Sequence, residues 1–248
     1  MAELLEVRDL KVWFPIKKGI FARTSGYVKA VDGVSFDLHR GETLGVVGES
    51  GSGKSTIARV ITGLQKPTEG SFKLDGRVAM VFQDPLGSLN PRMTVRATLE
   101  ESLLSAPVRE GADSTVGELL SLVGLDVSAL DKYPHEFSGG QRQRICIARA
   151  IATKPELLIC DEAVSALDLS IRSQVLDLLE DLKRKLGLSL LFITHDLGVV
   201  RHIADRILVM NRGKIIEEGP CGQVLKAPRE EYTRHLISSV PKIGKPLT

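Results

Sequence analysis

The chain has 248 residues, of which 43% are hydrophobic, and its 33 basic and 31 acidic residues leave a formal net charge of +2. This length allows one large domain with an inserted subdomain, and the near-neutral charge argues against a nucleic-acid-binding protein. Cys146, Cys160 and Cys221 lie far apart without a C-x-x-C pair, so neither a disulfide framework nor a zinc site is expected. The acidic N-terminus lacks a signal-peptide pattern, and no apolar run reaches the ~18 residues that cross a bilayer. We therefore expect a soluble chain whose membrane role, if it has one, comes through a partner.

The first third of the chain predicts strands on both sides of a glycine-rich turn. Strands are expected at residues 4–14 and 28–38, separated by a basic, glycine-containing excursion at residues 15–27. A turn then leads into an apolar strand at residues 43–47. The pattern indicates antiparallel strands ahead of a parallel unit.

Residues 48–55 fit the phosphate-binding pattern G-x-x-x-x-G-K-[ST] between an apolar strand and a helix. Small residues let consecutive backbone N–H groups turn inward around an anion, and the helix N-terminus adds its positive dipole end. Lys54 supplies a charge for the β- and γ-phosphates, and the Ser55 hydroxyl is placed to bind Mg²⁺. An ordinary glycine turn is disfavoured because apolar residues at helical spacing follow the loop. The expected phosphate contacts come from Gly48, Glu49, Ser50, Gly51, Ser52, Gly53, Lys54, Ser55 and Thr56.

Downstream of this loop the pattern changes twice. Short strands are expected up to residue 74 and at residues 77–82, and residues 84–155 then carry several short amphipathic helical patterns. The apolar faces expected there are Leu99, Leu103 and Leu104, and Leu119, Leu120 and Val123.

Continuous apolar runs return at residues 157–160 and 190–193, as expected for parallel strands buried on both faces. A helix between them is expected to end at Gly187. Its apolar face is predicted from Ile171, Val175, Leu178, Leu179, Leu182 and Leu186. Residues 206–217 predict a hairpin that turns at residues 211–213.

Polar residues follow the ends of these strands. Gln83 comes after one strand, where its carbonyl oxygen can reach Mg²⁺ or an attacking water; alone, it would be taken as an exposed polar residue. Asp161 and Glu162 follow a buried strand, at the edge where open parallel sheets bind ligands. Asp161 can hold Mg²⁺ through its water shell, and Glu162 can polarise water as a general base. His195, after the last core strand, is a candidate sensor of the γ-phosphate, whereas the other histidines are assigned no role.

A second candidate anion site lies at Ser138, Gly139, Gly140 and Gln141, where small residues open a helix expected at residues 142–153. Taken alone, this stretch would be a simple helix N-cap. One chain has no need of two phosphate sites unless the second serves a different nucleotide molecule.

These elements, in this order, resemble the ATP-binding-cassette (ABC) ATPases over nearly the whole chain. In that resemblance residues 48–55 are the Walker A loop, Gln83 the Q-loop and residues 138–141 the family signature. Residues 157–161 with Glu162 are Walker B and the catalytic glutamate, residues 165–168 the D-loop, and His195 the switch histidine. The implied fold class is α/β. It has a RecA-like P-loop NTPase core, an N-terminal antiparallel β subdomain and an inserted α-helical subdomain.

The resemblance divides the chain into four parts. Residues 1–83 hold the β subdomain and the first part of the core, and residues 84–155 form the helical subdomain with the signature. Residues 156–220 complete the core, and residues 221–248 are a C-terminal family tail.

Finer features are similar to the oligopeptide, dipeptide and nickel importer branch. They include residues 31–36, 80–85 and 88–92, and the tail from residue 227 to Val240-Pro241. Three departures stand out. Ala163 replaces a usual proline, Glu230-Glu231 replaces His-Pro, and about a helix length of chain is missing between Gly76 and Arg77. The last departure bears on how closely the arm that contacts the permease follows the family.

The resemblance implies ATP and Mg²⁺ as ligands, with Ser55, Gln83 and Asp161 as metal-binding residues. ATP would be sandwiched between Lys54 of one subunit and residues 138–141 of a second ABC ATPase subunit, either a copy or a paralogue. Transmembrane permease subunits and, indirectly, an extracytoplasmic solute-binding protein are the further partners. No nucleic acid is expected, and the location is cytoplasmic, on the inner face of the cell membrane.

The adenine base needs an aromatic platform, for which Tyr27 is the first candidate and Trp13 and Phe14 the alternatives. The expected function is ATP hydrolysis that powers uptake of peptides or nickel and metal chelates. Two alternatives are a soluble ABC-type ATPase of nucleic-acid or ribosome-linked processes and a regulator that does not hydrolyse ATP. One cassette, no long heptad insertion and neutral charge disfavour the first, and Glu162 with His195 disfavours the second.

Overall fold

The computed structural model describes residues 2–18, 23–105 and 115–239, and its chain divides into two compact units. Unit 1 comprises the chain up to Leu5, Leu38–Gly41 and Leu74–Leu191. Unit 2 comprises Glu6–Asp37, Glu42–Lys73 and the chain from Phe192 onward. Val240 and Pro241, at the end of the expected family tail, lie outside the described residues.

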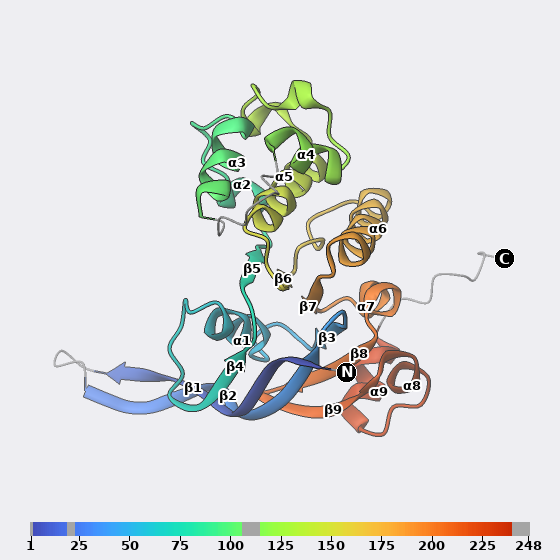
Figure 1. The fold of residues 1–248 in the computed structure, drawn as a ribbon. Helices are drawn as coiled ribbons and strands as arrows, with labels where there is room; N and C mark the ends of the chain where they lie inside the picture. Colours follow the sequence, from blue (N-terminus) through green and yellow to red (C-terminus); the bar gives the residue numbers. More distant parts are fainter. Residues whose placement is uncertain (1, 19–22, 106–114, 240–248) are drawn as a thin grey trace. The chain divides into compact units, whose positions relative to one another are not determined.

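Most of the residues in the antiparallel β subdomain belong to unit 2 (Figure 1). Strands β1 (Glu3–Lys18), β2 (Arg23–His39) and β4 (Glu69–Leu74) form a three-stranded sheet in the order β2-β1-β4. Both strands extend beyond their expected bounds into the glycine-containing excursion at residues 15–27, since β1 ends at Lys18 and β2 begins at Arg23. The two strands are neighbours in the sheet, and in their extended parts Ser25 Oγ donates to the Ile16 carbonyl at 3.2 Å.

The rest of unit 2 is built on a parallel strand pair. Strand β3 (Thr43–Val47) is wholly buried and pairs in parallel with β8 (Arg206–Asn211), which pairs antiparallel with β9 (Lys214–Pro220). This confirms the predicted hairpin. The helices in the described part of this unit are α1 (Lys54–Ile61), α7 (Leu197–Ile203), α8 (Cys221–Lys226) and α9 (Glu231–Ser238). The buried core of this region includes Val47 and Val209.

Unit 1 joins a second parallel pair to the helical part of the chain. Strands β5 (Val78–Val81) and β6 (Leu157–Asp161) pair in parallel, and the chain passes from unit 1 to unit 2 within β7 (Ser189–Thr194). The longer helices are α3 (Val95–Leu104), α4 (Val116–Leu122), α5 (Gly139–Ala152) and α6 (Leu169–Leu186), with short α2 (Pro85–Ser88), η1 (Val127–Ala129) and η2 (Pro134–Glu136). Helices α2, α3, α4 and α6 all contact α5, which carries the buried Ile145 and Ile147.

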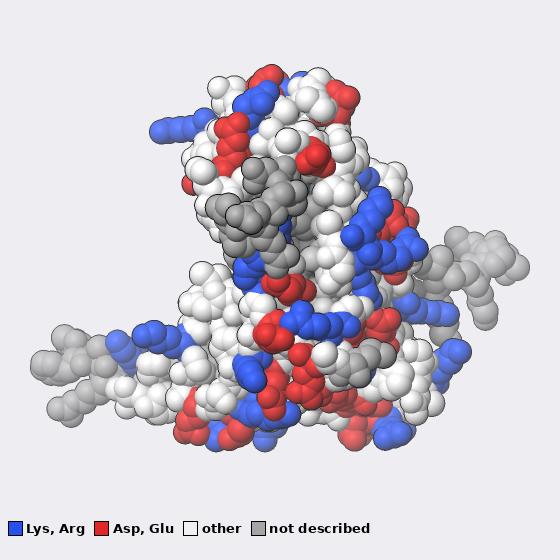
Figure 2. Space-filling view, viewed as in Figure 1, with Lys and Arg blue, Asp and Glu red and all other residues white. Residues whose placement is uncertain are grey.

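None of the helices in the described ranges is both long and apolar enough to cross a bilayer. On the face shown in Figure 2, basic and acidic side chains are interspersed.

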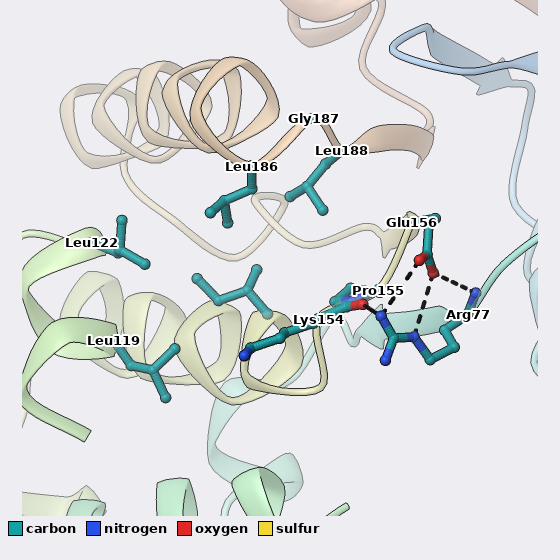
Figure 3. Close-up of a pocket in the computed structure, with 10 residues that line it drawn as sticks. Arg77, Leu119, Leu122, Lys154, Pro155, Glu156, Leu186, Gly187 and Leu188 are labelled. Carbon is teal, nitrogen blue, oxygen red and sulfur yellow. Dashed lines mark hydrogen bonds and ion pairs between the residues drawn. The ribbon is translucent and has the colours of Figure 1, made fainter. Parts of the chain in front are cut away.

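Gly76 and Arg77, between which about a helix length of sequence is expected to be missing, both make close contacts with Glu156. The Glu156 carboxylate accepts the Arg77 backbone N–H at 2.7 Å and forms an ion pair with its guanidinium at 3.4 Å. The guanidinium also donates to the Lys154 carbonyl, and a Cβ on Gly76 would lie 2.8 Å from the Glu156 Cβ. Arg77, Lys154 and Glu156 border a pocket of about 260 Å³ (Figure 3). Its other lining residues are Leu119, Leu122, Ile151, Pro155, Leu186, Gly187 and Leu188.

The Arg77–Glu156 contact predicts a pH-dependent contribution to stability. Burial would raise the pKa of Glu156, but hydrogen bonds and the charge of Arg77 outweigh it and hold the pKa below the ordinary 4.5. The stabilisation is therefore present above pH 4.5 and is lost as the pH falls through the lower folded-state pKa. Glu156→Gln should lower the free energy of unfolding at pH 7 by roughly 0.5–1 kcal/mol, because partial exposure screens the pair. Urea unfolding should show this difference shrinking towards pH 3. A difference that grew on acidification would contradict the assignment.

Candidate functional site

The phosphate loop of unit 2 connects β3 to α1 and is shaped by two glycines that no other residue can replace without strain. Gly48 has φ +154°, and a Cβ there would lie 2.2 Å from the Met210 carbonyl oxygen. Gly53 has φ +109°, and its Cβ would lie 2.1 Å from the Ala30 carbonyl oxygen. The backbone of the loop thus passes directly against β2 and β8, and this closely packed loop is called the cradle below.

Lys54 closes this cradle. Its side chain is buried, and the ammonium Nζ donates to the carbonyls of Gly48 and Glu49 at 2.8 Å each. It also lies 3.4 Å from the Ser52 hydroxyl. Ser55 and Thr56 follow in the first turn of α1. A buried cation in a glycine-rich loop at a helix N-terminus is typical of phosphate-binding sites.

Two other segments of unit 2 bond directly to the loop, and a third bonds to one of them. The Ser52 carbonyl accepts the Gly213 N–H at 2.9 Å, and the Gly213 carbonyl accepts the Asp32 N–H at 2.8 Å. The N–H of Glu49 donates to the Tyr232 hydroxyl of α9 at 3.2 Å. No sequence pattern singles out Tyr232, because the spacing of an apolar helix face does not mark one aromatic residue as a contact to a loop 183 residues earlier.

His195 follows β7 at the start of a well-defined turn. Thr194 Oγ1 accepts the Asp196 N–H at 3.0 Å, and the Asp196 carboxylate caps α7 by accepting the N–H groups of Gly198 and Val199. His195 itself is exposed. The turn fixes where its side chain leaves the backbone, which is what a phosphate-sensing role would require.

The aromatic candidates for the adenine platform lie on β1 and β2. The rings of Tyr27 and Trp13 are 6.3 Å apart, and the Trp13 ring is covered by Lys29 with Nζ 4.5 Å from its centroid. The Tyr27 side chain is 57% exposed and that of Phe14 40%. The Tyr27 ring is thus exposed and supported from one side, so Tyr27 stays the first candidate.

In unit 1, Asp161 ends β6, and Glu162 follows in an unusual backbone conformation. Glu162 has φ +50°, which is uncommon for any residue except glycine and costs about 1 kcal/mol. Its carbonyl accepts both the N–H of Ser165, at 3.1 Å, and the Ser165 hydroxyl, at 2.9 Å. Such strain is typical of functional turns, where it aims a side chain. Cys160 precedes Asp161 in β6. Burial and the Asp161 charge raise the pKa of its thiol to about 12, so Cys160 stays a neutral core residue.

Gln83 is brought to the same sheet edge as Glu162. In the parallel pair Val81 lies opposite Cys160, and Gln83 and Glu162 each follow two residues later. Gln83 is exposed, and α2 begins two residues later, with its N-terminus capped by the Asp84 carboxylate, which accepts the Leu86 N–H at 3.0 Å.

The signature residues form the N-terminus of α5. Ser138 Oγ accepts the Gln141 N–H at 3.3 Å, and Gln141 Oε1 accepts the Ser138 N–H at 3.0 Å, which is a capping box. Gly140 is buried against α6, because a Cβ there would lie 2.4 Å from the Cγ2 of Ile171. A Cβ on the exposed Gly139 would be 3.7 Å from Leu167, an ordinary contact.

The predicted site residues therefore fall into two groups. The phosphate loop, His195 and Tyr27 belong to unit 2, and Gln83, Asp161, Glu162 and residues 138–141 belong to unit 1. Within the described ranges no cluster of three or more His, Cys, Asp or Glu residues could hold a metal ion.

Comparison with known proteins gives consistent matches. Residues 31–165 match the family described as ABC transporter. The chain is 50% identical to the "Oligopeptide transport ATP-binding protein AppF" of Bacillus subtilis (strain 168) over 262 residues, covering 98% of this chain and 79% of the relative. It is 47% identical to the "Dipeptide transport ATP-binding protein DppF" of Escherichia coli (strain K12) over 259 residues, covering 97% and 77%. Because both alignments are longer than the 248 residues of this chain, they contain positions where this chain has no residue.

Two solved structures extend the match to the fold. The first is described as the dimeric structure of a post-hydrolysis state of the ATP-binding cassette MJ0796 bound to ADP and Pi. It has a TM-score of 0.74 and 27% identity, over 88% of this chain and 99% of that one. The second, described as cbiO1 of Clostridium perfringens, part of the ABC transporter complex cbiONQ, has a TM-score of 0.77 and 25% identity, over 98% of both chains. The chain therefore belongs to the ABC transporter family, as one of its ATP-binding ATPase subunits with the ABC ATPase fold.

Proposed function

We propose that this chain hydrolyses ATP to power the uptake of peptides through a membrane permease. The observation that carries the proposal is the near full-length similarity to oligopeptide and dipeptide transport ATP-binding proteins. These relatives favour peptides over nickel or metal chelates as cargo. The buried Lys54 in its backbone cradle and the strained turn at Glu162 support hydrolysis rather than a purely regulatory role.

The proposed working form is a dimer in which each ATP contacts two subunits. The triphosphate binds in the loop around Lys54 of one subunit and meets residues 138–141 of the other. A two-fold arrangement makes this interface self-complementary, or nearly so if the partner is a paralogue. The capped N-terminus of α5 supports the second half of this site, since helix N-termini attract anions. One of the similar structures is described as dimeric with bound ADP and Pi, which supports the same arrangement.

Mg²⁺ is the proposed metal, held by Ser55, Gln83 and Asp161. Hydroxyl, amide and carboxylate oxygens are the ligands that Mg²⁺ prefers, and the Asp161 carboxylate at the end of a buried strand suits a cation. When bound, the ion supplies positive charge that neutralises the phosphate oxygens during transfer.

Side chains of this protein accept the proton and position the reacting groups. Glu162 accepts a proton from the attacking water, whose oxygen forms a bond to the γ-phosphorus while the bond to the ADP oxygen breaks. Gln83 and His195 hold the water and the γ-phosphate in line, and Lys54 balances charge on the β- and γ-oxygens. The release of phosphate removes the contact that bridges the two subunits, so they separate.

The proposed permease contact lies on the helical part of unit 1. A surface depression there is lined by Phe82, Asp84, Gly87, Ser88 and Arg149, so its lining includes both sequence neighbours of Gln83. A permease segment seated there would be coupled mechanically to Gln83, and hence to the nucleotide state. The protein would act at the inner face of the cell membrane, with cargo delivered to the permease by an extracytoplasmic binding protein.

The test is reconstitution with the permease subunits in vesicles loaded with ATP. We expect di- or oligopeptide uptake that requires ATP. Substituting residues 85–92 should leave ATPase activity within about twofold and reduce transport per ATP at least about tenfold. Normal transport stoichiometry in those variants would refute the docking surface. ATP hydrolysis stimulated by RNA or ribosomes, but by neither permease nor peptide, would favour the soluble ATPase alternative.

A further inference from the structure

The C-terminal helix α9 contacts the phosphate loop directly, although the two are far apart in sequence. The Tyr232 hydroxyl accepts the N–H of Glu49 at 3.2 Å. Glu49 is the second residue of the loop, and its N–H lies next to Gly48, where the chain leaves β3. Within the described part of unit 2, this bond ties the catalytic loop to the tail of the chain.

Helix α9 is fixed firmly enough to act as a support. The Glu217 carboxylate of β9 accepts the N–H groups of Arg229 and Glu230, at 2.9 and 3.2 Å, just before α9 begins. Tyr232 and Leu236 pack against the buried cluster that includes Val47, the last residue of β3. Burial alone would raise the pKa of Glu217, but these hydrogen bonds outweigh it and keep the pKa below its ordinary value, so the anchor is ionised at neutral pH.

Both backbone polar groups of Glu49, its carbonyl and its N–H, are hydrogen-bonded within unit 2. Its carbonyl accepts the Lys54 ammonium at 2.8 Å and the Ser52 N–H at 3.2 Å, while its N–H is bound by Tyr232. When Lys54 turns towards a phosphate, the carbonyls of Gly48 and Glu49 lose the ammonium as a donor. The Tyr232 contact does not depend on Lys54 and can persist through that change.

We propose that Tyr232 is a positioning residue of the nucleotide site, whose hydroxyl keeps the phosphate loop in its binding shape while Lys54 engages ATP. This inference deepens the proposed ATPase function and rests on it. It gives the tail helix a function in ATP binding, distinct from any contact with the permease. Because Tyr232 acts on the loop through the Glu49 N–H and not on the reacting phosphorus, its effect falls on ATP binding in the ground and transition states alike.

The experiment compares steady-state ATPase kinetics of the wild type and Tyr232→Phe. The phenylalanine ring keeps the packing and removes only the acceptor. We expect KM for ATP to rise about threefold to tenfold with kcat within about twofold, as the loss of one hydrogen bond outside the reacting centre predicts. Glu217→Gln, which weakens the anchor of α9, should raise KM in the same direction.

Ser238→Ala is the matched control, because it removes a hydroxyl of the same helix that donates to the His235 carbonyl within α9, at 2.8 Å. Its KM should equal that of the wild type. NMR of ¹⁵N-glutamate-labelled protein supplies a second readout. The Glu49 amide should shift and exchange faster in Tyr232→Phe but not in Ser238→Ala.

An unchanged KM and an unchanged Glu49 amide in Tyr232→Phe would overturn the inference, as would an equal rise in KM in Ser238→Ala. If Tyr232→Phe does not fold, the Glu49 amide in Glu217→Gln decides the matter in the same way. A wild-type protein without ATPase activity would instead refute the proposed function and leave the Tyr232 contact to be judged from the amide alone.

Discussion

Glu162→Gln should reduce ATP turnover by about 10²–10⁴-fold, the usual contribution of a general base, while ATP binding changes little. Glutamine has the size of glutamate and can still hydrogen-bond a water, but it cannot accept the proton. The left-handed backbone at position 162 is equally unfavourable for glutamate and glutamine. The hydrogen bonds from Ser165 are made to the backbone carbonyl of residue 162 and do not involve its side chain. The turn should therefore survive the substitution, and only the chemistry should be lost.

The measurement is phosphate release together with size-exclusion chromatography in MgATP. The variant should accumulate as a dimer that retains ATP, because separation requires hydrolysis in the proposed cycle. Glu101→Gln is the matched control, since it removes an exposed carboxylate of α3 and should keep wild-type turnover. Unchanged turnover in Glu162→Gln would show that another group is the base, and joint loss of binding and turnover would indicate a collapsed turn.

The sequence pattern predicts correctly those parts of the fold in which the residues expected to be buried from the pattern are buried in the structure, or in which a short turn motif sets the backbone. The continuous apolar runs of β6 and β7 are buried along their whole length, and Gly187 ends α6 in the left-handed conformation, as expected. The hairpin of β8 and β9 turns at Arg212 and Gly213, both with positive φ, which is the geometry that such a two-residue turn requires. In each case one short stretch of sequence determines the conformation.

Predictions failed where neighbouring segments decide the outcome. Leu104 was assigned to an apolar helix face with Leu99, yet Leu104 is 88% exposed while Leu99 is buried. Leu104 is the last residue of α3, beyond the part of the helix that the surrounding residues bury. The long β1 and β2 strands likewise arise from pairing with each other across residues that have no strong strand pattern of their own.

The candidate site was predictable in its residue types but not in its supports. Glycine, lysine and carboxylate spacing marked the phosphate loop and Glu162, because phosphate and proton chemistry restrict what can stand there. The positive φ of Glu162 and the Tyr232 contact to Glu49 leave no trace in spacing, since one is a backbone angle and the other joins distant segments. Glu217 is similar, because its role as a cap depends on β9 and α9 lying together.

Gly53→Ala should weaken ATP binding at least about 100-fold, because it combines backbone strain with a clash that no rotamer can relieve. The added methyl group would lie 2.1 Å from the Ala30 carbonyl oxygen, and the residue would have to keep φ +109°. Relief requires the loop to move away from β2, and that movement also displaces Lys54, the next residue. The cradle would then lose its shape at the point where the helix N-terminus meets the phosphates.

The decisive measurement is calorimetric titration of each variant with ATP in the presence of Mg²⁺, with thermal unfolding recorded in parallel. Gly222→Ala in α8 is the matched control, because a Cβ there meets nothing within 4 Å and alanine is the better helix former. Gly51→Ala separates the two causes, since Gly51 has φ +82° but open space around it. The ATP affinity of Gly51→Ala should lie between those of Gly53→Ala and Gly222→Ala, because this variant has the backbone strain without the steric clash. If Gly53→Ala bound ATP as tightly as Gly222→Ala, the close approach of the loop to Ala30 could not be what shapes the cradle.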